Sequence, residues 1–485
     1  MLSLLLIIAC KQPQGAVMNT APSIYPDFSE ITIPSNIAPL NFLIEDSASK
    51  YLTLFEAGNV QVKVRGKKVC VPLGKWRNLT TKRNIKITVY EKKDKKWVCM
   101  QPFRINVAQE IDSYITYRII PPSFQYYNRL SINQRNITNF KEKVIYANSM
   151  ATTDASDQCI NCHNFRNWHA ERMQFHVRMY KGGTILDIDG KLRKLNLKTD
   201  STISAGVYPS WHPTHDYIAY STNQTFQKFH NNHTDRIEVF DEKSDLILYD
   251  ITNKTVSYIE NDSTELECFP SWAPDGKKLY FVSANIGNPS FFYENGGAAY
   301  FSQQIRYNLY SKSFNPDQRS WGKKQLLLNA DSLTSSITLP RVSPDGRWLM
   351  FTMGNHGVFH IWHKDSELYL MDLINGNYRC LEEINSPEVE SYHSWSSNGQ
   401  WIVFSTRRED GMYTRLYLSH LNQDGTFSKP FPVPQKDPEF SRKFMYSFNI
   451  PEFSVDPIKV SARELASFIN STEAGPVSYE QKRGE

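Results

Sequence analysis

The sequence lacks the features that mark several large functional classes. No apolar run is long enough to span a membrane, and the longest lies at the N-terminus, so we expect the body of the chain to be soluble. No run of Lys and Arg interleaves with aromatic residues and the formal net charge is only +5, so nucleic acid is not an expected partner. The chain has no Gly-x-Ser-x-Gly elbow and no Ser-x-Asp-x-Gly repeat, so serine hydrolase and sialidase chemistry lack support.

Aromatic residues, in contrast, are abundant. The 485 residues include 26 Tyr, 27 Phe and 10 Trp, a composition that excludes a disordered chain and favours many β-strands. The length exceeds that of one compact core, so we expect two or three structural units or one large repeat architecture.

The N-terminus resembles the signal box of bacterial lipoproteins. An apolar stretch from Met1 to Ala9 is followed directly by Cys10, which in that class would be acylated after cleavage. No Lys or Arg precedes the stretch, and the alternative is a frayed apolar N-terminus. The resemblance implies export, with the protein periplasmic or lipid-anchored to the outer membrane.

Cysteine is scarce, with seven residues in all. Cys70 and Cys99 lie in strand-like runs of one early region, and in an oxidising compartment they could form a disulfide.

The chain divides into five segments. Residues 1–21 are expected to be signal and linker, and residues 22–122 alternate short β-like runs with turns, which predicts a small β-sandwich. A connection follows over residues 123–172, then a repeat region over 173–455, then a short helix and tail over 456–485.

The repeat region contains four similar segments. They begin at Tyr208, Phe269, Leu339 and Tyr392, and each combines a strand, a tight turn and a second strand. Asp275-Gly276, Asp345-Gly346 and Asn398-Gly399 suit that turn, whereas the first copy has His215-Asp216 there. A third and a fourth strand complete each unit, which predicts a β-propeller blade. We expect about six blades, the ring being closed by residues 443–448 with a strand from before residue 160.

The repeats resemble those of TolB-like propellers over roughly residues 173–450. The fold class expected is therefore all-β: a β-sandwich, then a TolB-like propeller with a short haem-attachment insert. Such a resemblance implies an exported scaffold that binds partners, and it names no ligand.

Cys159-Ile160-Asn161-Cys162-His163 matches the attachment pattern of c-type haem. Two thiols three residues apart on one turn can add to the two vinyl groups of a porphyrin, and His163 can then be the axial iron ligand. A disulfide or redox pair and a zinc site are the alternatives. Zinc is the weakest of them, because no second Cys-x-x-Cys or His-x-x-x-His completes a tetrahedral set.

The second axial ligand is expected among residues 173–179. We choose His176 over Met173 and Met179 as this ligand. Strand alternation alone does not decide which face of the strand meets a haem. Arg166 and Arg178 are candidates to pair with the haem propionates.

The chain also resembles TolB-like lipoproteins that carry a cytochrome c domain, and this resemblance covers nearly the whole mature chain. The matching features are the Cys-x-x-Cys-His motif, Phe175-His176-Val177-Arg178 and Gly182-Gly183-Thr184. The resemblance implies covalent haem c and electron transfer or a redox-linked interaction with a redox or envelope protein. The alternative is a non-enzymatic scaffold in which Cys159 and Cys162 are structural.

Three long loops are expected on the propeller face opposite the Asp-Gly turns. They span residues 224–241, 285–303 and 353–365 and hold five histidines together with several aromatic residues, which suggests a ligand face. The histidines are His230, His233, His356, His360 and His363. A metal site among them, or a haem enzyme that uses them, is a less favoured alternative.

Overall fold

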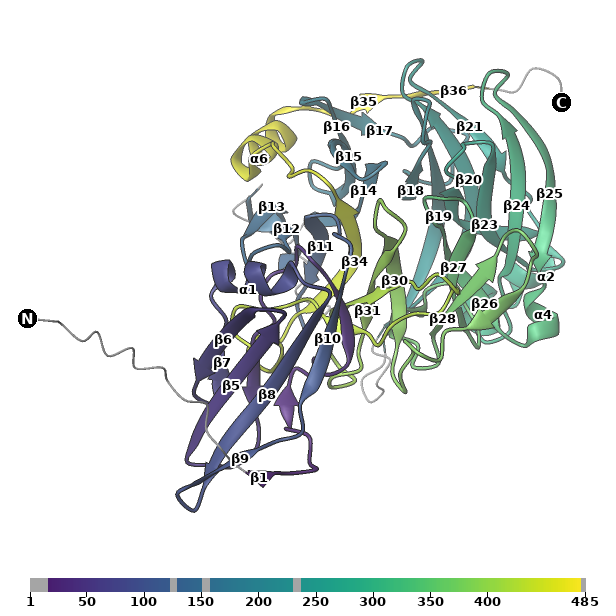
Figure 1. Cartoon of the computed structure of the whole chain (residues 1–485). Coiled ribbons are helices and arrows are strands. Elements are labelled where there is room, and N and C mark those ends of the chain that lie inside the picture. The colour runs from purple at the N-terminus through teal and green to yellow at the C-terminus, as the bar shows by residue number, and fades with distance from the viewer. Residues whose placement is uncertain (1–15, 123–128, 151–157, 230–236, 481–485) are drawn as a thin grey trace, which may run out of the picture. The chain divides into compact units, whose positions relative to one another are not determined.

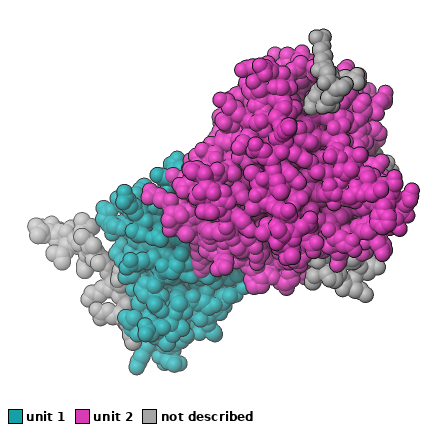
Figure 2. All heavy atoms as spheres, turned by 90° about the vertical axis from the view of Figure 1, so that its right-hand side faces the viewer, with its two compact units in different colours: residues 1–110, 434–443 teal, residues 111–433, 444–485 magenta. Residues whose placement is uncertain are grey.

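The computed structural model describes residues 16–122, 129–150, 158–229 and 237–480. They form two compact units, of which unit 1 comprises residues 1–110 and 434–443 and unit 2 comprises residues 111–433 and 444–485 (Figures 1 and 2). No helix in the described ranges is both long and apolar enough to cross a membrane.

Unit 1 contains a seven-stranded sheet, a three-stranded sheet and two helices. The larger sheet consists of β1 (Ala16–Val17), β3 (Ile31–Pro34), β5 (Lys50–Ala57), β6 (Val60–Arg65), β8 (Asn84–Lys93), β9 (Lys96–Cys99) and β10 (Phe103–Ala108). The smaller sheet consists of β2 (Ile24–Tyr25), β4 (Phe42–Ile44) and β7 (Lys68–Val69), and the helices are α1 (Leu73–Thr80) and α5 (Phe440–Lys443).

The expected early strands are present, but their arrangement is not that of a simple antiparallel sandwich. β1 pairs with β9 in parallel, and so does β3 with β10. Helix α1 was not expected, and it is held by the buried Trp76, whose indole N–H donates to the main-chain oxygen of Ile37 at 2.9 Å. Cys70 and Cys99 are both free thiols, so the disulfide considered for them is not formed in this structure.

Unit 2 consists of six antiparallel four-stranded sheets, two of which gain a short parallel edge strand. In the order of the ring, the first sheet is β14 (Gln158–Arg166), β15 (His169–Met179), β16 (Gly183–Ile188) and β17 (Lys191–Asn196), and the second is β18 (Val207–Trp211), β19 (Tyr217–Phe229), β20 (Ile237–Asp250) and β21 (Thr255–Glu260). The third sheet is β22 (Glu265–Trp272), β23 (Lys278–Asn285), β24 (Asn308–Asn315) and β25 (Ser320–Leu328), and the fourth is β26 (Ser336–Val342), β27 (Trp348–Gly354), β28 (Glu367–Asp372) and β29 (Tyr378–Cys380). The fifth sheet is β30 (Glu390–Trp395), β31 (Trp401–Thr406), β32 (Arg415–His420) and β33 (Phe431–Pro432), and the sixth is β34 (Ser447–Ser454), β11 (Tyr114–Ile120), β12 (Ser131–Asn136) and β13 (Glu142–Ala147).

The first-named strands of these sheets form a closed ring. β14, β18, β22, β26, β30 and β34 each lie against the next, and β34 lies against β14 (Figure 1). We refer to the six sheets as blades 1 to 6 in that order. Blade 6 combines the late strand β34 with the early strands β11 to β13, and β34 pairs antiparallel with β11. This is the arrangement of a six-bladed β-propeller, in which the pairing of β34 with β11 closes the ring.

The Asp-Gly turns adopt the conformation for which glycine was expected. Gly276, Gly346 and Gly399 have φ values of 69°, 74° and 70°, where a side chain would be strained. The turn in the first copy contains no glycine, and His212 supports it by accepting hydrogen bonds from the main-chain N–H groups of Thr214 and His215.

Several segment boundaries differ from the expected ones. Tyr114–Ile120 belongs to the propeller and not to unit 1, because it pairs with β34. The supposed connection over residues 123–172 supplies strands β12, β13 and β14. Helix α6 (Ala462–Ser471) is present as expected, and the tail after it adds β35 (Gly475–Pro476) and β36 (Ser478–Tyr479) to the outer edges of blades 1 and 2.

The expected loop over residues 224–241 is largely β-structure. β19 and β20 continue their pairing as far as Phe229 and Ile237, so they form a long hairpin. The segment 285–303 contains the short helices α2 (Pro289–Glu294) and α3 (Gly297–Phe301), and 353–365 contains the 3-10 turn η4 (His360–Trp362).

Candidate channel, chamber and funnel

Each inner strand has an irregularity at the same level of the propeller. The pairing register shifts between residues 161 and 164 in blade 1 and at the matching place in the other five blades. At this level each strand directs one residue at the axis, and we call the set the channel ring. Its members are Cys162, Tyr208, Phe269, Leu339, Tyr392 and Ile450. Five of the six have φ between 50° and 58°, which is uncommon for residues with a side chain and occurs in β-bulges.

The channel ring places the Cys-x-x-Cys-His motif in the propeller repeat. Cys162-His163-Asn164-Phe165 of β14 occupies the position that Tyr208-Pro209-Ser210-Trp211 has in blade 2. The motif was expected on a turn inserted before the propeller. It lies instead on the inner strand of blade 1, because residues 158–166 pair with β15.

The channel ring encloses a narrow space of about 30 Å³, which is little more than a single water molecule needs. The imidazole of His163 lies at this space, and its Nε2–H donates to the main-chain oxygen of Thr116 in blade 6 at 3.2 Å. Burial lowers the pKa of His163 to about 4, so the ring is neutral at physiological pH. Burial also raises the pKa of the Cys162 thiol, which makes it a poor nucleophile.

A larger cavity lies at the end of the channel where the inner strands begin, and we call it the chamber. It has a volume of about 730 Å³. Its apolar wall consists of Ile120, Pro121, Leu130, Met179, Phe229, Ile237, Val239, Phe359, Ile361 and Trp362. The remaining lining residues are Arg118, Cys159, Asn161, Arg178, Tyr208, Asn223, Thr225 and Gln227.

The two arginines of the chamber differ in their contacts. Arg118 is buried and donates to the main-chain oxygen of Ile160, to Asn161 Oδ1 at 2.7 Å and to Asn449 Oδ1. Arg178 is half-buried and has no hydrogen-bond or ion-pair partner among the described residues. A guanidinium on a mostly apolar wall can therefore bind an anionic group of a ligand.

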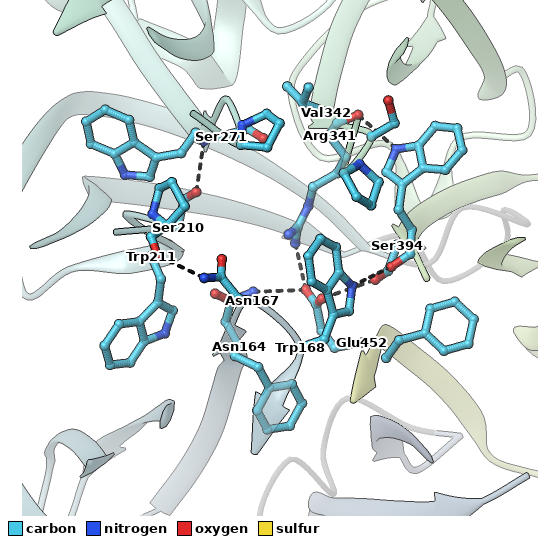
Figure 3. Close-up of a pocket in the computed structure, with 18 of the residues that line it drawn as sticks. Asn164, Asn167, Trp168, Ser210, Trp211, Ser271, Arg341, Val342, Ser394 and Glu452 are labelled. Atoms are coloured by element: carbon cyan, nitrogen blue, oxygen red, sulfur yellow. Dashed lines mark hydrogen bonds and ion pairs between the residues drawn. The ribbon is translucent and has the colours of Figure 1, made fainter. Parts of the chain in front are cut away.

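The opposite end of the channel opens into a smaller cavity of about 130 Å³, which we call the funnel (Figure 3). The inner strand of each blade contributes a polar residue to its lining: Asn164, Ser210, Ser271, Arg341, Ser394 and Glu452. Arg341 forms an ion pair with Glu452 at 2.8 Å, and the same carboxylate accepts hydrogen bonds from Asn164 and Ser394. The charged groups of the funnel thus satisfy one another, which Figure 3 shows as converging dashed lines.

The arrangement of the motif does not fit a c-type haem. Cys159 lines the chamber, whereas Cys162 lines the narrow channel and is buried. Attachment through two thioethers requires both thiols to reach one edge of the same porphyrin. Here the strand and its bulge turn the two thiols to different spaces, and the space beside Cys162 and His163 is too small for a macrocycle.

The expected second iron ligand is also directed elsewhere. His176 pairs with Asn161 across β14 and β15, and its Nδ1 lies 3.1 Å from the hydroxyl of Thr184 in its own blade. His163 is directed at blade 6 instead, so the two imidazoles do not face one shared space. Arg166 lies at the far end of β14 from Cys159 and forms an ion pair with Asp216 at 2.9 Å, so it does not join Arg178 at the chamber.

Of the five loop histidines, the structure brings together His356, His360 and His363. Their rings lie close, with centroids 4.8 Å apart for His356 and His363 and 5.3 Å apart for His360 and His363. His230 and His233 lie outside the described residues, as does the proposed lipidation site Cys10.

Sequence reasoning missed several residues of these sites. Arg118 reaches the chamber only because β11 joins β34, and Glu238 lies beside the histidine cluster although it is 118 positions away from His356 in the sequence. One missed feature did have a signal: Ile450-Pro451 repeats the apolar-Pro pair of Tyr208-Pro209, Phe269-Pro270 and Leu339-Pro340.

Comparison with known proteins does not assign a family. No protein-family model matches the chain, and no curated protein matches it. Among solved structures, a luciferin-regenerating enzyme is 10% identical with a TM-score of 0.36 and covers 65% of this chain and 90% of its own. The β-propeller domain of the trilobed protease from Pyrococcus furiosus is 10% identical with a TM-score of 0.34, covering 74% and 95%.

Prolyl oligopeptidase B from Galerina marginata is also 10% identical, with a TM-score of 0.36. The match covers 71% of this chain and only 42% of that protein. At these scores we draw no functional conclusion from the likenesses.

Proposed function

We propose that unit 2 is a TolB-like, non-enzymatic binding propeller whose chamber holds an apolar ligand with a carboxylate group. The observation that carries this proposal is the position of Arg178, a guanidinium without a partner among the described residues, on the wall of a largely apolar chamber.

The chemistry of the wall supports such a ligand. Burying apolar surface contributes about 25 cal/mol per Å², and a hydrogen bond to a charged group contributes about 1.5–3 kcal/mol. Arg178 can offer a carboxylate two parallel N–H groups, while Phe229, Phe359 and Trp362 offer apolar contacts. The class of ligand is therefore an amphipathic carboxylic acid.

Binding without catalysis is supported by what lines the chamber. Cys159 is the thiol on its wall, and the described lining residues include no histidine and no carboxylate that could activate it. We further propose that the protein acts at the bacterial envelope, anchored through Cys10, and that the loaded propeller interacts with an envelope protein.

A fluorescence titration with a dansyl-labelled fatty acid tests the binding proposal. We expect saturable binding, and we expect Arg178→Gln to weaken it at least about tenfold because a charge-assisted hydrogen bond is lost. Arg463→Gln is the matched control, since Arg463 is exposed on α6 and lines no part of the chamber, and it should bind as the wild type does. Equal affinity of both variants would exclude the proposed role of Arg178.

Haem c is the second candidate, and one observation favours it. The chamber beside Cys159 offers apolar walls and two guanidiniums, which suit an apolar macrocycle with two propionates. The positions of Cys162 and His163 oppose it. Intact-mass measurement of the protein, co-expressed with a haem-attachment system, distinguishes the two candidates. We expect the mass of the polypeptide alone. An added haem mass that survives denaturation would replace our first proposal with haem c binding.

A further inference from the structure

A cluster of potential metal ligands lies in unit 2, apart from the channel and the funnel. Glu238 is at the start of β20, His356 follows β27, and His363 directly follows η4. One ligand atom from each of the three lies within 4.8 Å of the others. His356 Nε2 is 3.6 Å from Glu238 Oε1.

The imidazoles of this cluster have nitrogens available for coordination. His363 is 95% buried, and its Nδ1 has no hydrogen-bond partner among the described residues. His356 Nε2 is likewise buried and makes no hydrogen bond there. Leaving a buried polar group without a partner is unfavourable, and a coordinated ion would remove that cost. Burial and the neighbouring imidazoles lower the pKa of His363, and the neutral imidazole is the form that binds metals.

The loop that carries the two histidines is already shaped by its own contacts. His360 Nε2–H donates to the main-chain oxygens of His356 and Gly357. Asp365 Oδ2 accepts the main-chain N–H of Asn355 at 2.5 Å. These contacts hold His356 and His363 near each other without using the ligand atoms.

We propose that Glu238, His356 and His363 bind one divalent transition-metal ion such as Zn²⁺. Two imidazoles and one carboxylate suit zinc and its neighbours better than Ca²⁺ or Mg²⁺, which take oxygen ligands. The three ligands leave a fourth position open for water or another donor.

The ion would connect two elements that also form the chamber wall. Ile237 and Val239 flank Glu238 and line the chamber, and so does Trp362 beside His363. Strand alternation directs Glu238 away from that wall. The metal would thus join β20 to the loop over residues 355–363 from behind the chamber, whatever ligand the chamber holds.

Calorimetric titration of Zn²⁺ into the full chain, freed of metal by chelation, tests this site, with Co²⁺ absorption as a second readout. We expect one ion per chain and a visible Co²⁺ band typical of imidazole coordination. Glu238→Gln preserves size, and His363→Ala removes a nitrogen that makes no hydrogen bond. Each should weaken Zn²⁺ binding by at least about tenfold.

His169→Ala is the control, because His169 is exposed and its Nδ1 lies 3.0 Å from Asp456, which is not part of the cluster. Circular dichroism without metal verifies that each variant is folded. The proposal is overturned if the folded wild type binds no Zn²⁺, if Glu238→Gln and His363→Ala both bind it as tightly as the wild type, or if His169→Ala abolishes binding.

Discussion

Trp168 and Trp395 connect two blades that are not neighbours in the ring. The indole N–H of Trp168, in the turn between β14 and β15 of blade 1, donates to the main-chain oxygen of Trp395 in blade 5 at 2.7 Å. The turn places Trp168 over the funnel, where Figure 3 shows it beside Arg341 and Glu452. This turn therefore joins the two blades on either side of blade 6, whose inner strand closes the ring.

Trp168→Phe should lower the free energy of unfolding by about 1 kcal/mol, because it removes the donor and leaves the carbonyl of Trp395 to find water. Urea denaturation measures this difference. His169→Ala changes the next residue along the chain, the exposed first residue of β15, and should have a smaller effect. If the two substitutions cost the same, the hydrogen bond makes no specific contribution.

The carboxyl of Glu267 should make the protein less stable in alkaline solution. Both of its oxygens are buried and have no hydrogen-bond partner in the part of the chain that the structure describes, and burial raises its pKa from about 4.5 to about 9. Between these values the folded state holds a proton that the unfolded state has released, so stability falls as the pH rises. Glu267→Gln should raise the free energy of unfolding at pH 8 by a few kcal/mol and change little at pH 4. Denaturation at the two pH values checks this, and an equal effect at both would argue against a protonated Glu267.

His176 should make the protein less stable in acid. Burial lowers its pKa to about 3, whereas the ordinary value is about 6.5. The contribution of the neutral His176 to the free energy of unfolding is fully present above pH 6.5. It is lost as the pH falls towards 3, because the unfolded chain takes up a proton on this histidine before the folded chain does. From pH 7 to pH 5 the wild type should lose up to about 2 kcal/mol more stability than His176→Gln. Identical losses in the two proteins would contradict the low pKa.

Thiol labelling should separate the cysteines by their surroundings. Cys70 is exposed and should react first with a maleimide, and the half-buried Cys159 should react more slowly. Cys162 and Cys268 are buried and should react only after denaturation. Peptide mapping of the labelled protein reads this order. A Cys159 and Cys162 that both stay unlabelled in denaturant would mean that they are covalently occupied, as haem c attachment requires.

Local signals predicted much of the propeller. The strands of the four repeats and the glycine turns follow from short patterns, since turn conformation and strand alternation depend on neighbouring residues. The closing role of β34 was also anticipated, because Phe448 lies in an unassigned strand-like run near the end of the chain.

The function of the Cys-x-x-Cys-His motif could not be read from its spacing. The same five residues suit a haem-binding turn and an inner strand, and pairing with β15 is what places Cys162 in the channel ring. Arg118 and Glu238 could not be predicted from the sequence for a similar reason. Only the closed ring brings Arg118 to the chamber wall and Glu238 to His356.

The role of Arg178 in binding a carboxylate is tested by comparing two ligands with two proteins. Calorimetry would give the affinity of dodecanoate and of dodecanol for the wild type and for Arg178→Gln. We expect the wild type to prefer the acid by about tenfold or more, and we expect the variant to lose this preference while still binding the alcohol. An acid preference of the same size in both proteins would exclude Arg178 as the group that binds the carboxylate.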